Sequence, residues 1–201
     1  ICRQLALDGF DVIVHANHHL EAAQRLSSEI VAAGGKAQAL AFDLTDASAT
    51  SAAIEAILAQ GPVQVLVNNA GIHDDAVFPG MNLTQWHRVI DVSLNGFFNV
   101  TQPLMMQMIR TRWGRIINIT SVAAVVGNRG QVNYSAAKGA LHAATKSLAL
   151  EVASRGITVN AVAPGPVATE LFLQDKSEEQ VRHFAKLPPL ERLGQPQDIA
   201  D

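Results

Sequence analysis

Short apolar segments alternate with helical segments along the chain, and this alternation limits the fold more than any other feature. The apolar segments, each as long as a typical strand, are 11–15, 37–42, 63–67, 115–119 and 157–162. The helical segments are 20–33, 47–60, 84–110 and 132–154. Strands joined through helices form a parallel sheet with helices on both faces. The sequence therefore predicts a doubly wound α/β fold of three layers, αβα, in a single domain over 1–201.

The stretch 169–195 departs from this alternation because it is polar, shows no strand pattern and carries Pro188-Pro189. Long segments of this kind are often lids, so we predict that residues 170–195 cover a substrate. Both ends look cut: residues 1–9 resemble the tail of a helix closed by Gly9, and 196–201 the start of another. We therefore expect a chain that is truncated at both ends.

The composition argues against several classes of protein. Apolar residues make up 48% and charged residues 16%, which is typical of a globular protein with a buried sheet. A net charge of −3 does not favour binding to nucleic acid. We expect no association with a membrane, because no apolar run reaches the ~18 residues needed to cross one. The single cysteine, Cys2, cannot form an internal disulfide, which favours a cytoplasmic protein.

Ligands of open parallel sheets bind beyond the carboxyl ends of the strands, so candidate site residues are sought there. Small residues at such ends let a ligand approach the backbone, and polar ones can hydrogen-bond it. Taken singly, each segment is more often a turn than a site. The candidates are Asn17, Asp43, Leu44, Asn69, Ala70, Gly71, Ser121, Pro164, Gly165, Val167 and Thr169.

Tyr134 and Lys138 lie four residues apart in a predicted helix, which places them on one face. A phenol with a pKa near ~10 is a poor acid–base group at neutral pH, but a neighbouring ammonium can lower that pKa. Ser121 follows a predicted strand, where its hydroxyl can hold a substrate carbonyl near Tyr134. The alternative interpretation is a helix-surface pair and a serine that caps the next segment.

Together these motifs resemble the short-chain dehydrogenase/reductase family over the whole chain. The motifs, in order, are Asp43-Leu44, Asn68-Asn69-Ala70-Gly71, Ser121, Tyr134-x-x-x-Lys138, Pro164-Gly165 and Thr169. The resemblance implies a Rossmann-type fold in which Ser121 orients a carbonyl, Tyr134 is the general acid, and Lys138 binds the nicotinamide ribose. It also implies that Asp43 and Leu44 meet the adenine. Residues 69–71 would line the adenosine side, and Val167 and Thr169 would hold the carboxamide beside Pro164 and Gly165.

Three stretches are similar to the 3-oxoacyl-(acyl-carrier-protein) reductases: 127–134, 153–160 and 189–196. In that branch, basic residues near the active-site mouth dock the acidic carrier protein, and Arg112 and Arg155 fall at matching places. The alternative for both is an ordinary solvated charge. The resemblance also implies a homotetramer or homodimer that pairs through the helices at 84–110 and 132–154, although their apolar residues are equally compatible with a core.

The chain departs from the family pattern in two respects. The glycine-rich loop expected to cradle the pyrophosphate is absent, and we expect that the first and last strands of the fold are missing from this chain. Ser93 stands where the family usually has an asparagine that shapes the active site and a proton relay. A serine reaches less far and cannot offer both an amide donor and acceptor, so we include Ser93 among the catalytic candidates with its relay in question.

The segment after the first predicted strand bears on the choice of cofactor. An NAD-dependent enzyme places an acid there to hold the ribose 2′-hydroxyl, whereas this chain has no carboxylate before Glu21. Asn17 and its histidine neighbours can instead donate hydrogen bonds to a 2′-phosphate. The sequence therefore favours NADPH over NADH. It predicts no metal site, because no further ligand-type residue follows at metal-binding spacing.

The leading hypothesis is an NADPH-dependent reductase of a 3-oxoacyl thioester. One alternative is a short-chain reductase or dehydrogenase of another small carbonyl or alcohol, such as a sugar or steroid. The other, from a different class, is a cofactor-binding protein without turnover, which Ser93 and the cut ends favour but the Ser121, Tyr134 and Lys138 set does not.

Overall fold

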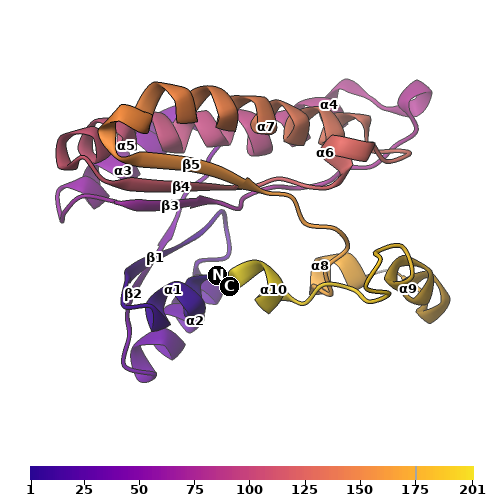
Figure 1. Ribbon diagram of the computed structural model, residues 1–201, viewed down its shortest axis with the longest axis horizontal. Coiled ribbons are helices and arrows are strands. Elements are labelled where there is room, and N and C mark those ends of the chain that lie inside the picture. Colours follow the sequence, from indigo (N-terminus) through magenta and orange to yellow (C-terminus); the bar gives the residue numbers. More distant parts are fainter. Residues whose placement is uncertain (175) are drawn as a thin grey trace. The chain divides into compact units, whose positions relative to one another are not determined.

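The computed structural model describes residues 1–174 and 176–201, and every predicted strand is present within two residues of its expected bounds (Figure 1). All the pairing within each sheet is parallel, as predicted, but the strands form two sheets instead of one. The strands are β1 (Asp11–Ala16), β2 (Lys36–Ala41), β3 (Val65–Asn68), β4 (Gly114–Ile119) and β5 (Ile157–Val162). The sheets have the orders β1-β2 and β3-β4-β5.

The chain divides into two compact units, each of which is described by itself. The smaller unit comprises Ile1–Asp43 and Pro164–Asp201, and the larger comprises Leu44–Ala163. The prediction of a single domain is not tested by this division and stays a prediction.

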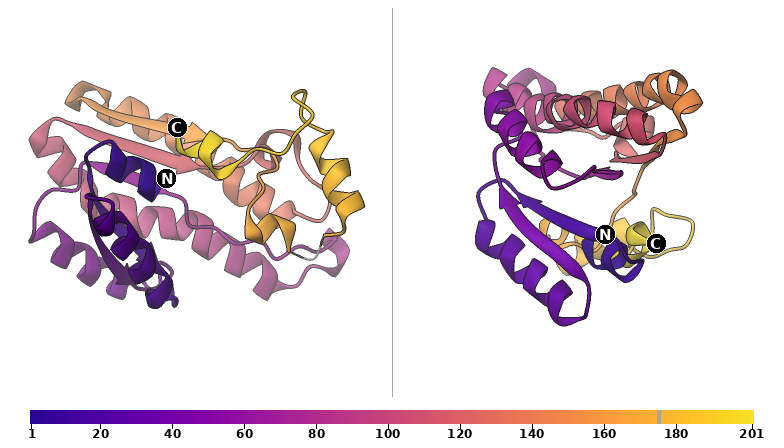
Figure 2. Two further views of the ribbon diagram at one scale, coloured as in Figure 1. Left: turned by 90° about the horizontal axis from the view of Figure 1, so that it is seen from below. Right: turned by 90° about the vertical axis from the view of Figure 1, so that its left-hand side faces the viewer.

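In the smaller unit, α2 (Leu20–Ala32) packs on β1 and β2, as Figure 2 shows, and α1 (Cys2–Leu7) packs on β1. A small apolar core of Val12, Val14, Ala23 and Ile30 holds these elements together. In β1 the buried residues Val12 and Val14 stand at alternate positions, which is the expected period of a strand.

The segment after β5 in the smaller unit is more regular than the sequence indicated. Its described residues form the short helices α8 (Glu170–Leu173), α9 (Glu178–Ala185) and α10 (Pro196–Ala200). An isolated parallel bridge also joins Val167 to Gly194. The predicted substrate cover at 170–195 includes residue 175, which lies outside the described residues, so its role stays a prediction.

In the larger unit, α3 (Ala47–Leu58) begins at the predicted residue, and the Asp46 side chain caps it by accepting a hydrogen bond from the Ala49 amide at 2.9 Å. The predicted helix over 84–110 is three elements: α4 (Leu83–Ile90), a π-helical turn η2 (Asp91–Asn95) and α5 (Gly96–Thr111). Asn82 caps α4 in a reciprocal box with Gln85, so the helix begins one residue before the predicted start at Thr84, which lies within the first turn.

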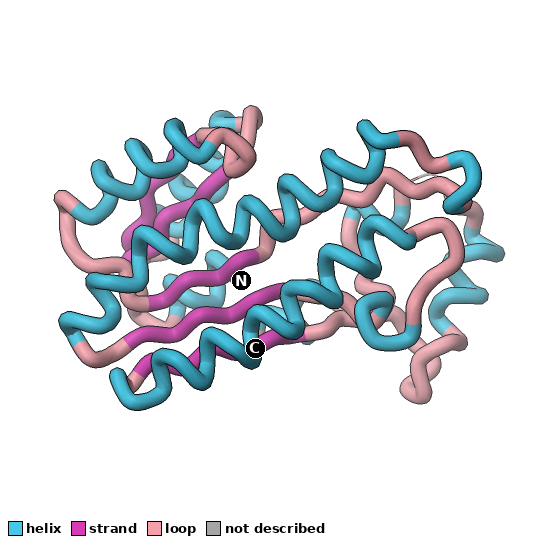
Figure 3. Tube along the Cα trace, turned by 90° about the horizontal axis from the view of Figure 1, so that it is seen from above, coloured by secondary structure: helices cyan, strands magenta, loops and turns pink. Residues whose placement is uncertain are grey.

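The remaining elements of this unit are η1 (Phe78–Gly80), α6 (Ala123–Val126), α7 (Val132–Val152) and η3 (Ala153–Arg155). Long helices of this unit run along its strands, as Figure 3 shows. Met108 of α5 and Val152 of α7 pack with Ile116, Ile157 and Val159 of β4 and β5 into one apolar core. This packing holds α7 against the sheet, so that the first turns of the helix lie near the carboxyl end of β4. No helix in the described part of the chain is both long and apolar enough to cross a lipid bilayer.

Candidate active site

The structure brings the predicted catalytic residues together at the carboxyl end of β4. Ser121 follows this strand by two residues, and Tyr134 and Lys138 lie on successive turns of α7. A hydrogen bond joins Ser121 to the phenol of Tyr134, and the Lys138 ammonium lies 5.8 Å from the centre of the Tyr134 ring. The prediction that Tyr134 and Lys138 share one helix face near the end of a parallel sheet is therefore confirmed.

Lys138 is held by the backbone of the strand. Its Nζ donates to the carbonyl oxygen of Ile119, the last residue of β4, at 2.8 Å. The residue is 3% exposed, and burial disfavours the charged form, which lowers the pKa of this lysine to about 8. The ammonium is thus a much better proton donor than an exposed lysine.

The acidity of Tyr134 corrects an expectation from the sequence. We expected Lys138 to lower the pKa of the phenol, but burial raises the pKa of Tyr134 above its ordinary value. The hydrogen bond with Ser121 lowers this pKa in part, and the negative charge of Asp75 raises it further. In this structure the Tyr134 phenol therefore stays protonated at neutral pH and gives up its proton less readily than an exposed tyrosine.

Ser93 lies in the π-helical turn η2 and reaches the same site. A Cβ built on Gly71 would lie 3.0 Å from the Lys138 Nζ and 3.6 Å from the Ser93 Oγ, so these three residues are neighbours. Ser93 is 2% exposed, and its hydroxyl has no hydrogen-bond partner among the described residues. It borders a cavity of about 10 Å³ that Leu44 and Ala70 also line. Asn95, two residues on, instead bonds Asp91 at the surface.

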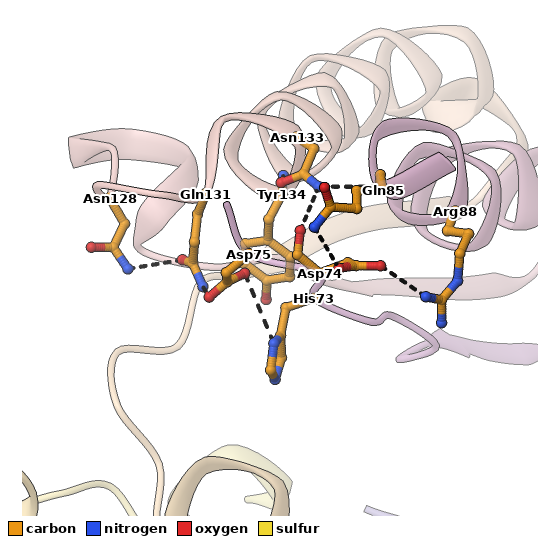
Figure 4. A network of polar contacts seen from close by, with 9 residues as sticks. All are labelled: His73, Asp74, Asp75, Gln85, Arg88, Asn128, Gln131, Asn133 and Tyr134. Atoms are coloured by element: carbon orange, nitrogen blue, oxygen red, sulfur yellow. Dashed lines mark hydrogen bonds and ion pairs between the residues drawn. The ribbon is translucent and has the colours of Figure 1, made fainter. Parts of the chain in front are cut away.

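A polar network anchors the first turn of α7 to the segment after β3 (Figure 4). Asn133 is fully buried and donates from Nδ2 to the backbone oxygens of Asp74 at 3.0 Å and Gln85 at 3.1 Å. Its Oδ1 accepts from the Tyr134 amide at 2.8 Å. Asn133 thereby sets the position of the tyrosine backbone, a role that sequence reasoning missed although a polar residue beside the key tyrosine was visible.

A second network behind the site was also missed. Asn68, at the end of β3, donates to Thr101 at 3.1 Å and to Asn118 of β4 at 2.9 Å. Asn118, fully buried, donates to Thr145 of α7 at 2.8 Å. Asn68 thereby ties β3 to the neighbouring strand β4. The signal for Asn118 was its place as a polar residue inside the apolar strand 115–119.

The predicted cofactor residues divide between the two units. Leu44, Asn69, Ala70 and Gly71 belong to the larger unit with the catalytic residues, and the Leu44 carbonyl accepts from Asn99 at 2.8 Å. The others belong to the smaller unit: Asn17, Asp43, Pro164, Gly165, Val167 and Thr169. Asn17 is exposed beyond β1, and the Thr169 hydroxyl caps α8 by accepting from Phe172. Their roles toward a cofactor stay predictions.

Arg112 and Arg155 do not lie where the sequence placed them. Both precede strands, β4 and β5 respectively, whereas Ser121 follows the carboxyl end of β4. A strand of this length spans about 20 Å, so the two arginines occupy the opposite edge of the sheet from Tyr134. Arg112 donates to the Ser154 carbonyl at 3.0 Å, which brings the two arginines into one region. Within one chain they therefore do not flank the active-site mouth.

No group of three His, Cys, Asp or Glu side chains within residues 1–174 and 176–201 has the arrangement of a metal site.

Comparison with known proteins identifies the family. The family model of the short chain dehydrogenases matches residues 1–180. This chain belongs to the short-chain dehydrogenase family. The match confirms the predicted fold class, and the short-chain dehydrogenase is an NAD(P)-dependent oxidoreductase.

Curated relatives align with this short-chain dehydrogenase over nearly its whole length. The 3-oxoacyl-[acyl-carrier-protein] reductase FabG of Aggregatibacter actinomycetemcomitans is 40% identical over 100% of this chain and 82% of its own. The 3-oxoacyl-[acyl-carrier-protein] reductase of Synechocystis is 43% identical over 98% and 78%. The acetoacetyl-CoA reductase of Cupriavidus necator is 39% identical over 100% and 81%. The resemblance to the 3-oxoacyl reductase branch is thus confirmed.

Proposed function

We propose that this protein uses NADPH to reduce the 3-oxo group of an acyl thioester to the 3-hydroxyacyl form. The observation that carries the proposal is the cluster of Ser121, Tyr134 and Lys138 at the carboxyl end of β4, in which a phenol of raised pKa bonds the serine. Relatives at about 40% identity that are named 3-oxoacyl-[acyl-carrier-protein] reductases support the substrate class.

The residues of the chain can supply both polar functions that the reduction needs. The Ser121 hydroxyl donates a hydrogen bond to the substrate carbonyl oxygen and holds it beside the phenol of Tyr134. NADPH, when bound, would supply the hydride for the carbonyl carbon. Tyr134 then gives its proton to the oxygen that carries the developing charge, which completes the alcohol.

Lys138 is suited to restore the proton of Tyr134. Its ammonium has a pKa of about 8, whereas the pKa of the phenol is raised above its ordinary value. Transfer of a proton from Lys138 toward a tyrosinate is therefore downhill. The buried Ser93 hydroxyl lies near Lys138 and is placed to help position its ammonium, although a serine lacks the reach of an asparagine.

The cofactor would be held by small and polar residues beyond the strand ends. The absence of a side chain at Gly71 suits a ligand beside Lys138, since any Cβ there would press on the ammonium. Leu44, Asn69 and Ala70 line the same end of the larger unit, and we assign the same role to the six candidates of the smaller unit. NADPH is preferred over NADH because Asn17 stands where an acid would repel a 2′-phosphate.

We also propose that the acyl group arrives on acyl carrier protein and that Arg112 and Arg155 contact this acidic partner. Because these arginines lie at the sheet edge opposite Tyr134, a carrier bound there would serve the site of another copy in a homo-oligomer. A coenzyme A thioester is the second candidate, which the acetoacetyl-CoA reductase relative favours. The single cysteine and this chemistry support a cytoplasmic location.

Replacement of the general acid tests the proposed function. We expect Tyr134→Phe to lower kcat for acetoacetyl thioester reduction by about 10²-fold or more, because proton donation contributes on that scale. The affinity for NADPH, measured by fluorescence titration, should change little, because the ring is retained. Ser147→Ala, an exposed change on the same helix, is the control. Turnover by Tyr134→Phe at the wild-type rate would reject Tyr134 as the acid.

A further inference from the structure

Asp75 is held beside Tyr134 by contacts from the residues that precede the tyrosine. Its Oδ2 accepts from the Gln131 Nε2 at 2.8 Å, and the Ala76 amide donates to the Gly130 carbonyl at 2.9 Å. Asn128 in turn donates to Gln131 at 2.8 Å. Figure 4 shows the Asp75 carboxylate and the Tyr134 ring on the same side of this network. The backbone and side chain of Asp75 are therefore both fixed relative to the phenol.

The charge of Asp75 is compensated less than that of its neighbour. Asp74 bonds the Arg88 guanidinium at 2.8 Å and the Gln85 amide at 3.0 Å. In the described part of the chain, Asp75 has no ion pair with a lysine or arginine, and its one ionisable partner is His73, with Nδ1 3.8 Å from Oδ1. The negative charge of Asp75 acts on the Tyr134 phenol, where it opposes formation of a second negative charge.

A substrate carbonyl must bind within hydrogen-bond reach of this same phenol. In a free 3-oxo acid, the carboxylate is separated from the reacting carbonyl by a single carbon, so its charge enters the field of Asp75. In a thioester the corresponding group is uncharged. Asp75 therefore repels the first substrate and has little effect on the second.

We propose that Asp75 is a specificity-determining residue that disfavours substrates whose carboxylate is separated from the reacting carbonyl group by a single carbon. This inference rests on the proposed function, because it concerns the substrates of the same site. The Asp75 side chain is 44% exposed, so the repulsion is partly screened by solvent. It adds discrimination at the mouth of the site without a direct contact with the thioester.

The test compares Asp75→Asn with the wild-type protein on two substrates. The first is acetoacetate, and the second is the uncharged acetoacetyl thioester of N-acetylcysteamine. The asparagine keeps an oxygen that can accept from Gln131 while the charge is removed. We expect kcat/KM for acetoacetate to rise about fivefold, as for one partly screened charge pair, and that for the thioester to stay within about twofold. Asp46→Asn, which removes a charge but preserves a helix cap, should change neither value.

A second measurement does not depend on turnover. Tyr134 is the single tyrosine of the chain, so the ultraviolet absorbance of its phenolate reports this residue alone. We expect the midpoint of this titration to fall in Asp75→Asn and to stay unchanged in Asp46→Asn. This titration measures the effect of the Asp75 charge on the phenol in the absence of any substrate.

Each outcome decides the matter. A gain confined to acetoacetate, together with a lower titration midpoint, supports the proposal. Equal changes on both substrates, or none, overturn the role of Asp75 in selectivity while the proposed reduction stands. If the wild-type protein reduces neither substrate but the titration still shifts, the proposed function itself fails, and the selectivity fails with it.

Discussion

The buried pair of Tyr134 and Lys138 favours the neutral form of both groups. Burial raises the pKa of the phenol and lowers that of the ammonium. The lysine therefore has the lower pKa of the two, whereas an ordinary lysine has a slightly higher pKa than an ordinary tyrosine. Sequence spacing predicted that the side chains would meet, and they do. The spacing could not predict the direction of the tyrosine shift, because this depends on burial and on Asp75, which tertiary packing brings close.

The same burial makes the stability of the protein depend on pH. The pKa of Lys138 is about 8 in the folded protein against 10.5 for the ordinary group, so between these values the unfolded chain binds more protons. Stability therefore rises as pH increases through this window, by up to about 3 kcal/mol from this residue. The raised pKa of Tyr134 acts in the opposite sense only above its ordinary value of 10.0.

Urea unfolding at several pH values tests this linkage. We expect the free energy of unfolding of the wild-type protein to gain on that of Lys138→Met between about pH 8 and pH 10. The comparison of slopes removes the constant effect of the substitution on packing. Lys146→Met, at an exposed position of α7, should keep the wild-type slope. Parallel pH profiles for wild type and Lys138→Met would show that the buried ammonium is not coupled to folding.

At the level of elements, the π-helical turn η2 shows what a periodic pattern leaves out. The pattern over 84–110 predicted one helical segment, and the structure contains α4, η2 and α5 in its place. Such turns keep helical hydrogen bonding but shift the face presented by one residue, so apolar periodicity barely records them. The shift here buries Ser93 beside Gly71 and Lys138 and leaves Asn95 at the surface.

The joint between η3 and β5 depends on a glycine that a side chain would block. Gly156 has φ of +71°, and a Cβ there would lie 2.4 Å from the Arg112 carbonyl oxygen. We expect Gly156→Ala to lower the free energy of unfolding by more than Gly34→Ala. Gly34 also has a positive φ, of +89°, but a Cβ there meets nothing within 4 Å. The control should cost roughly 1 kcal/mol, from the left-handed backbone alone.

Denaturant unfolding of both variants measures the difference. Equal losses would mean that the Arg112 backbone moves aside without penalty. A larger loss in Gly156→Ala would show that the backbone contact between the segments entering β4 and β5 is rigid, which also fixes where Arg112 and Arg155 are presented.

At the scale of the whole molecule, the sequence predicted the elements and their parallel pairing but not their division into two sheets. The periodicity of apolar residues indicates that a segment is a strand, but it does not say which other strand lies beside it in a sheet. The catalytic set was predictable because Ser121 follows the end of a strand and because Tyr134 and Lys138 lie four residues apart on one helix. Asn118, Asn133 and Asp75 were not, because their partners lie far away in sequence. The docking role of Arg112 and Arg155 stays a prediction, and the resemblance did not indicate that both residues precede strands of the sheet.

The structure also separates core from surface among the apolar residues of the long helices. Leu104, Met108 and Leu141 are buried and belong to the interior. Met106 of α5 and Leu150 of α7 remain exposed, as does Phe98. Large exposed apolar side chains on helices are candidates for a subunit interface. The expected pairing through these helices therefore depends on this second group.

Light scattering tests the association, and Leu150 is the position to change because it is 85% exposed on α7. We expect the wild-type protein to have the mass of a dimer or tetramer, and Leu150→Glu to shift it toward the monomer, since a buried unpaired carboxylate opposes association. Leu7→Glu is the matched control, because Leu7 is 75% exposed on α1, outside the long helices. A wild-type monomer, or equal loss of mass in both variants, would contradict pairing through α7. A wild-type monomer would also remove the second copy that a carrier protein bound at Arg112 and Arg155 needs in order to reach a catalytic tyrosine.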